Sequence, residues 1–234
     1  MKKLSSEELQ KIIADHKLWI ESGRSEGKRA ALHNTNLSGV SLIGVDLDHA
    51  NLSGSNLTFA DLEESSFQGA CFSGADLSGA SFRSACLQDT LMDGATMTGT
   101  YFVSASLRGA GIRSANLTNA KLSYSELINV DLTNSDLTGA DLYGAELRNA
   151  RLEFVTGCDV LSFQYMKHYA YYWNGHVKIG CLCFPLEQWL QSYQDHGRRE
   201  RYSDKEIKVY GSWLRWLRGV REDLSPTEIE EKLS

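Results

Sequence analysis

The residues best suited to chemistry are cysteines and histidines in the last third of the chain. Cys181 and Cys183 lie two positions apart, and His176 comes shortly before them. Thiolate and imidazole groups are ligands that zinc prefers, and a closed zinc site needs four of them. A thiol beside an imidazole is also the arrangement of a cysteine nucleophile and its base. Further candidate ligands in this region are Cys158, His168 and His196.

The spacing of these residues argues against both kinds of site. Cys-x-Cys is not a common zinc spacing, and no second cysteine pair follows it. Nothing marks an orienting carboxylate or an oxyanion hole for Cys183 with His176 or His168. The pattern is typical of two half-buried structural cysteines. We therefore predict no cofactor, no catalytic residue and no enzymatic activity, and keep thiol- or metal-dependent chemistry at Cys181 and Cys183 as an alternative.

A hairpin is the element that would position these side chains. The Asn-Gly pair at 174–175 predicts a two-residue turn. Residues 177–184 are predicted to form the return strand, in which side chains two apart share a face. That strand would carry both Cys181 and Cys183 on one side, with His176 nearby across the turn.

Three helices are predicted after the hairpin. Pro185 begins the first, because proline suits the first helical turn. Ser203 and Glu206 form a capping-box pattern that begins the second. Ser225-Pro226 begins a third, short helix. Strands followed by helices indicate a small αβ module at the C-terminal end of the chain.

Basic and aromatic residues of this module are candidates for binding a partner. Arg198, Arg199 and Arg201 lie between the first two helices, where they would dock an acidic partner or phosphate, or form a solvated loop. Trp213 and Trp216 of the second helix would form an exposed stripe or belong to the core. The aromatic content suits an interface, and a homodimer through this module stays open.

The middle of the chain repeats every five residues. From Leu32 to Leu152 every fifth residue is large and apolar, at 25 positions without exception, and the residue two before each is Ala, Ser, Thr or Val. A period of five fits neither a helix nor a plain strand, and a strict repeat indicates a solenoid. Residues two apart point the same way in an extended segment, so both point inward. The fifth residue, often Gly or Asn, forms a corner, and four corners close one coil.

Units such as residues 75–79 (ADLSG) and 140–144 (ADLYG) follow the pattern A(D/N)LxG. This pattern resembles the pentapeptide repeat family over roughly residues 30 to 155. The resemblance implies a mainly β fold, a right-handed quadrilateral parallel β-helix. Twenty-five units make about six coils, roughly 30 Å tall at about 4.8 Å per coil. Phe82 and Phe102, twenty residues apart, are expected to stack in adjacent coils.

An amphipathic helix is predicted before the repeats. Ser5 and Glu8 form a capping-box pattern, and His16 and Trp19 lie on its apolar face. Solenoids need their ends covered, so we expect this helix to cap the first coil. The predicted domains are the capping helix over 1–29, the β-helix over 30–155 and the hairpin-plus-helices module over 156–234.

One wall of the column is predicted to be a ladder of small polar groups. One interpretation is a regular binding surface, with Asp76 and Asp136 as candidate contacts and Asp141 of the next wall beside them. The other is a flat wall without a binding role, whose short polar side chains pack well against each other. Its outward residues are Asn36, Ser38, Asn56, Thr58, Asp76, Ser78, Thr96, Thr98, Asn116, Thr118, Asp136 and Thr138.

The charge of the column limits its partners. Residues 30–155 hold 14 acidic and 6 basic residues, net −8, so we expect no direct nucleic-acid binding there. The resemblance implies one specific mechanism, in which some family members imitate duplex DNA, bind gyrase, and inhibit it or protect it from quinolones. Duplex DNA carries one charge per about 1.7 Å, so a matching column needs about 18 negative charges. The repeat run also lacks the loops of the gyrase-protecting members.

These features predict a non-enzymatic protein–protein interaction protein of bacterial or phage type. A rigid acidic column and an aromatic-rich C-terminal module would bind a protein partner. Gyrase modulation by DNA mimicry is the first alternative. The polar N-terminus predicts no signal peptide, and the lack of an apolar run of about 18 residues predicts no membrane span. Cys71 and Cys86 occupy outward positions on different walls, and exposed thiols of this kind predict a reducing, cytoplasmic setting.

Overall fold

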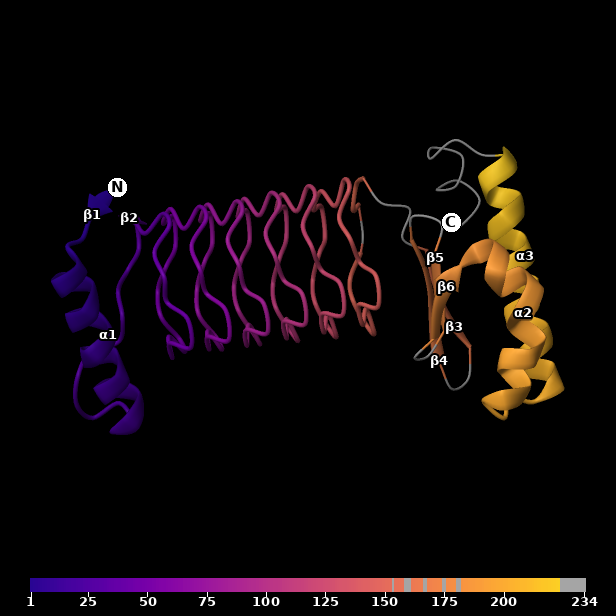
Figure 1. Cartoon of the computed structure of the whole chain (residues 1–234), viewed down its shortest axis with the longest axis horizontal. Coiled ribbons are helices and arrows are strands. Elements are labelled where there is room, and N and C mark those ends of the chain that lie inside the picture. Colours follow the sequence, from indigo (N-terminus) through magenta and orange to yellow (C-terminus); the bar gives the residue numbers. More distant parts are fainter. Residues whose placement is uncertain (153, 158–160, 166–167, 174–175, 180–181, 224–234) are drawn as a thin grey trace. The chain divides into compact units, whose positions relative to one another are not determined.

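The chain forms two compact units, Met1–Asp159 and Val160–Ser234 (Figure 1). The computed structural model describes residues 1–152, 154–157, 161–165, 168–173, 176–179 and 182–223. No helix within these ranges is long and apolar enough to cross a membrane.

The first unit is a column of parallel coils with four sides. Parallel bridges join residues twenty positions apart, from Ala31 with Asn51 to Asp136 with Thr156. The bridges fall at four places in each set of twenty residues, which confirms the four-sided coil. Each wall is named here after its first outward position. In chain order these are the Ala31, Asn36, Ser41 and Asp46 walls, so the Ala31 and Ser41 walls lie opposite each other.

Large apolar side chains fill the centre of the column. Every predicted large position from Leu32 to Leu147 is at most 4% exposed, and most of the small residues two before them are buried as well. The rings of Phe82 and Phe102 stack with centroids 5.3 Å apart. Both the inward assignment and the aromatic stack are therefore confirmed.

The fifth residue of each unit turns the corner. It has a positive φ whether it is glycine, as at Gly79 (66°), or a larger residue, as at Asn129 (59°) and Tyr124 (59°). Glycine and asparagine adopt this left-handed conformation most readily, which explains why they are common at these corners. Aromatic residues at the same position, Phe59, Tyr124 and Phe154, are exposed on the surface of the column.

The N-terminal helix covers the first coil, as predicted. Helix α1 (Ser6–Glu21) follows a capping box in which Ser5 Oγ accepts the Glu8 N–H at 3.1 Å and the Glu8 carboxylate accepts the Ser5 N–H at 2.7 Å. Its His16 is buried against the column. Strand β1 (Lys2–Lys3) pairs in parallel with β2 (Thr35–Asn36), which adds one strand to the edge of the Asn36 wall.

The second unit is an antiparallel sheet with two helices. Strands pair in the order β3-β4-β5-β6, and Figure 1 shows both helices on the same side of the sheet. Tyr172, Val177, Trp189, Tyr210 and Leu214 are among its buried core residues. The bounds are β3 Leu161–Tyr165, β4 His168–Trp173, β5 His176–Ile179, β6 Leu182–Pro185, α2 Leu186–Arg199 and α3 Asp204–Asp223.

The prediction of one return strand over 177–184 is wrong. Strand β5 ends at Ile179, and β6 begins at Leu182 and pairs with β5 in the antiparallel sense. Trp173 pairs with His176, on either side of the predicted turn, but the two turn residues themselves lie outside the described ranges. The predicted third helix at Ser225-Pro226 also lies outside them.

The helix starts in this unit agree with their sequence signals. Pro185 is the N-cap of α2. Ser203 Oγ accepts the Glu206 N–H at 3.3 Å, and the Glu206 carboxylate accepts the Ser203 N–H at 2.7 Å, which confirms the capping box of α3.

Candidate interaction surface

The cysteines and histidines of the second unit do not form a described site. Cys158 and Cys181 lie outside the described residues, and so do the side chains of His168, His176 and Cys183. The His196 ring stacks on Phe184 with centroids 5.0 Å apart, as part of the packing below α2. Among the described residues, no group of three or more His, Cys, Asp or Glu is placed to hold a metal ion. Thiol or metal chemistry stays a prediction.

The candidate docking residues of the helices are exposed where the structure describes them. Arg198 and Arg199 end α2, Arg201 follows it, and all three are exposed. Arg198 forms an ion pair with Asp195 of the same helix at 3.3 Å. The side chains of Trp213 and Trp216 on α3 lie outside the description. Arg198 and Arg199 thus belong to the last turn of α2 and not to the connection between the helices, where they are predicted, and the role of the cluster as a docking patch stays a prediction.

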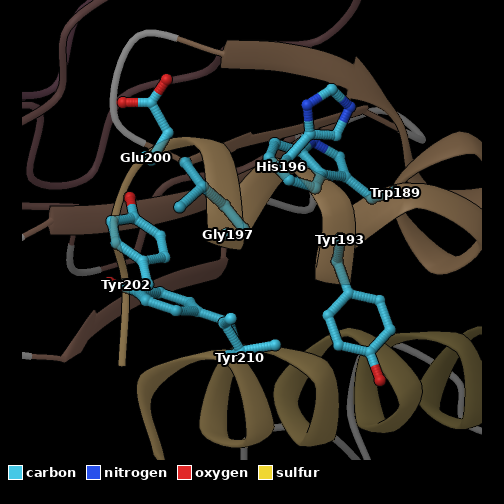
Figure 2. Close-up of a pocket in the computed structure, with 9 residues that line it drawn as sticks. Trp189, Tyr193, His196, Gly197, Glu200, Tyr202 and Tyr210 are labelled. Atoms are coloured by element: carbon cyan, nitrogen blue, oxygen red, sulfur yellow. The ribbon is translucent and has the colours of Figure 1, made fainter. Parts of the chain in front are cut away.

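An aromatic pocket lies between α2, α3 and the sheet (Figure 2). Trp189 and Tyr210 are almost fully buried there, and the Trp189 indole N–H donates to the Val177 carbonyl at 2.7 Å. The cavity measures about 10 Å³, the room of one water molecule. Its rings therefore belong to the core of the unit, and the space does not suit an organic ligand. Its lining residues are Ile179, Trp189, Tyr193, His196, Gly197, Glu200, Tyr202, Ile207 and Tyr210.

The polar ladder of the Asn36 wall satisfies its own backbone. Asp76 Oδ1 accepts the Ser78 N–H at 3.0 Å, and Asp136 Oδ1 accepts the Thr138 N–H at 2.9 Å. Hydrogen bonds from Thr138 lower the pKa of Asp136. On the next wall, Asp141 accepts the Tyr143 N–H at 3.0 Å in the same way. These three carboxylates, predicted as partner contacts, hold the turns of their own units, which favours the flat-wall interpretation.

A buried carboxylate joins three coils of the Ala31 wall. The Asp131 Oδ2 lies 2.7 Å from Arg113 Nε and 3.3 Å from Arg151 Nη1, and Thr133 donates to its other oxygen. Burial acts to raise the pKa of Asp131, but the hydrogen bonds from Thr133 and Arg113 outweigh it and lower the pKa to about 2. The network therefore ties three successive coils of this wall together at its surface.

Exposed aromatic side chains gather on the Ser41 wall. Tyr101, Tyr124 and Tyr143 are 39%, 60% and 40% exposed, on three successive coils. Arg83, one coil earlier, places its Cζ 5.2 Å from the centre of the Tyr101 ring. The rings of Tyr124 and Tyr143 meet edge to face, 5.4 Å apart. We call Arg83, Tyr101, Val103, Tyr124 and Tyr143 the tyrosine patch; large aromatic and arginine side chains of this kind characterise protein interfaces.

Comparison with known proteins identifies the family of the column. The family model "Pentapeptide repeats" matches in eight copies, at residues 28–63, 41–79, 60–99, 75–110 and 115–153. The chain belongs to the pentapeptide repeat family. Members of this family form right-handed quadrilateral β-helices, in agreement with the four-sided parallel column. No curated protein is similar enough to count as a match.

Solved pentapeptide repeat proteins are among the chains similar in structure. One from the Arabidopsis thaliana thylakoid lumen is 28% identical over 41% of this chain and 67% of its own, with a TM-score of 0.40. QnrB1, a plasmid-mediated fluoroquinolone resistance protein, is 22% identical over 55% and 67%, with a TM-score of 0.42. A pentapeptide repeat protein from Nostoc PCC 7120 is 23% identical over 59% and 92%, with a TM-score of 0.36.

The tyrosine patch is absent from the sequence predictions although the repeat contains the signal for it. Outward positions on one wall recur every twenty residues, so Arg83, Val103 and Tyr143 lie in a single line of side chains along that wall. Tyr101 belongs to the same wall, and Tyr124 is the fifth residue of its unit, which the repeat already assigns to a corner of that wall. Arranging the outward residues by coil, rather than by unit, would have shown an aromatic wall.

Proposed function

We propose that this pentapeptide repeat protein works without catalysis, by binding another protein through the tyrosine patch. The observation that carries the proposal is the exposure of three tyrosines and an arginine on one wall of a rigid column. Interface hot spots are enriched in tyrosine and arginine, because these side chains bury a large area and still form hydrogen bonds. The polar Asn36 wall, whose carboxylates are used internally, offers no comparable anchors.

The patch is held in place before any partner arrives. Arg83 lies over Tyr101, and Tyr124 meets Tyr143, so these side chains already support one another. The backbone below them is tied coil to coil, as in the bond from the Tyr124 N–H to the Tyr143 carbonyl at 2.8 Å. A preorganised surface loses less conformational entropy on binding, which favours affinity.

The partner is proposed to be a bacterial or phage protein in a cytoplasmic setting. Gyrase modulation by DNA mimicry remains the alternative, and QnrB1 is the similar protein whose name refers to fluoroquinolone resistance. The net charge of −8 on residues 30–155 is about half of what a DNA-like rod of that height needs. The alternative predicts salt-sensitive inhibition of supercoiling, which the tyrosine-patch proposal does not.

Site-specific photo-crosslinking tests the proposal. A photoreactive phenylalanine analogue replaces Tyr124 in one protein and Asn134 in a second. Both are exposed corner residues with positive φ, 59° and 61°, and the corner of Asn134 lies diagonally across the column. We expect a partner crosslinked from position 124 and not from position 134. Equal crosslinking from both positions would refute a role for this wall.

The captured partner is then purified for affinity measurements. The variant Tyr101→Ser, Tyr124→Asn, Tyr143→Ser should bind it at least about tenfold more weakly, as expected for the loss of interface anchors. The matched variant on the opposite wall, Leu91→Ser with Ser114→Asn, should bind normally. Retained affinity in the tyrosine variant would move recognition to another surface, with the C-terminal module as the next candidate. Gyrase as the captured partner would instead support the alternative.

A further inference from the structure

One backbone N–H of the first coil, that of Ala30, bonds to a side chain instead of to a backbone carbonyl. Along the column, the small inward residue donates its N–H to the carbonyl of the preceding large residue, as Ala50 does to Leu47 at 2.9 Å and Ala70 to Phe67 at 2.9 Å. Ala30 is the first inward residue and has no preceding repeat unit. Its N–H donates instead to Nδ1 of His16 on α1, at 3.0 Å. An imidazole thus replaces a backbone carbonyl at the edge of the column.

This contact requires neutral histidine. Because Nδ1 accepts a hydrogen bond, the single ring proton of the neutral form lies on Nε2. The Nε2 atom is buried and has no hydrogen-bond partner among the described residues. The ring is fully buried and stacks on Trp19, with centroids 5.5 Å apart. A second proton on Nδ1 would face the Ala30 N–H and remove the acceptor that this N–H has in the structure.

We propose that His16 is a pH-sensitive latch, whose protonation breaks its bond to Ala30 and releases α1 from the first coil. Release uncovers the Ala30 N–H and the apolar face of α1. Strand β1 still holds the chain to Asn36 at the neighbouring wall, so the opening is local. An uncovered solenoid end presents unpaired backbone groups to a further strand.

The charged groups around the ring set the pH range. Burial lowers the pKa of His16, and Arg29 acts in the same direction, whereas the charges of Asp46 and Asp48 and the backbone of Asp48 partly oppose them. The folded state therefore favours the neutral ring. Its stabilising effect is complete above the unfolded value of about 6.5 and is lost as the pH falls below that value. Acidic rather than neutral conditions should open the latch.

Hydrogen exchange of the full-length protein tests the latch. We expect protection of the Ala30 amide, corrected for intrinsic exchange, to fall at least about tenfold between pH 7.5 and 5, while amides of the central coils stay protected. His16→Gln offers an amide acceptor that does not titrate, so its protection should not change with pH. The control His33→Gln removes an exposed histidine of the first coil and should behave as the wild type.

Unchanged protection of Ala30 in the wild type, or the same loss in His16→Gln, would overturn the proposal. If His16→Gln does not fold, NMR of the wild-type imidazole decides. The expected result is an Nε2–H tautomer at neutral pH whose protonation coincides with a shift of the Ala30 amide. Protonation of His16 that leaves this amide unchanged contradicts the latch.

Discussion

The ring of Tyr124 lies over Gly144, which occupies the same corner one coil further along the column. A Cβ added to Gly144 would lie 2.7 Å from Cδ1 of Tyr124, closer than such atoms approach. Phe59 has the same relationship to Gly79, where the added Cβ would lie 2.6 Å from the ring. Glycine at the second corner therefore lets the aromatic side chain of the first lie along the column.

Replacement of Gly144 by alanine should destabilise the column and displace Tyr124. Alanine at a φ of +70° is strained, and its Cβ also pushes the ring away. Gly99→Ala is the matched control, since Gly99 has a φ of +64° and nothing within 4 Å of its added Cβ. We expect Gly99→Ala to cost about 1 kcal/mol and Gly144→Ala about 1 kcal/mol more, measured by urea unfolding followed by circular dichroism. Equal losses would show that Tyr124 does not rest on Gly144.

Enlargement of a small inward residue should disrupt the column far more than enlargement of an outward one. Ala115 is buried, and its N–H donates to Ser135 Oγ at 3.1 Å. Ala115→Leu inserts three carbons into a filled centre and should cost about 1–3 kcal/mol or prevent folding. Arg108→Leu changes an exposed side chain of a nearby coil and should alter stability by less than about 0.5 kcal/mol. An unchanged melting temperature of Ala115→Leu would contradict the inward assignment.

The Asp131 network should make the column sensitive to strong acid. The pKa of Asp131 in the folded state is about 2, below its ordinary value of 3.8. Because the folded value is the lower one, the carboxylate stabilises the fold above about pH 4, by at most about 2 kcal/mol, and this is lost as the pH falls toward 2. Asp131→Asn should be less stable at pH 7 and should lose less stability on acidification.

The control for Asp131 comes from another wall of the same column. Asp76→Asn places at position 76 the residue that Asn56 provides one coil earlier and Asn116 two coils later. Each of these asparagines accepts the N–H of the residue two positions ahead, as Asp76 does. We expect its urea midpoint to follow the wild type from pH 7 to 2. If the wild type and Asp131→Asn lose the same stability between pH 7 and 2, the acid sensitivity does not come from the Asp131 carboxylate.

The column was predictable because its rule is local. Each unit places a large and a small residue inward and turns at the fifth position, so a pair such as Ala75 and Leu77 shows the pattern without any distant contact. The tyrosine patch depends on the twenty-residue pitch, which brings Tyr101 and Tyr143 to one wall. Likewise His16 was placed on the apolar face of its helix, but its bond to Ala30 exists only once the helix docks.

The second unit shows where local signals fail. Capping residues located α2 and α3 correctly, because Ser203 and Glu206 act within one helical turn. The break between β5 and β6 was missed, since an apolar run containing a single glycine fits one interrupted strand as well as two paired strands. Strands β5 and β6 both contact α2, and such contacts are not visible in the sequence pattern.

The capping box of α3 should support the second unit. Glu206 is buried and accepts hydrogen bonds from the Ser203 N–H at 2.7 Å and the Ser203 hydroxyl at 2.8 Å. Glu206→Ala removes this acceptor and should cost about 1–2 kcal/mol, whereas Glu206→Gln keeps an acceptor of the same length and should lose clearly less. Glu200→Ala, an exposed change beside α2, is the control. Tryptophan fluorescence in urea measures the effect, because four of the five tryptophans lie in this unit. A Glu206→Ala variant as stable as the wild type would show that the box contributes nothing to α3.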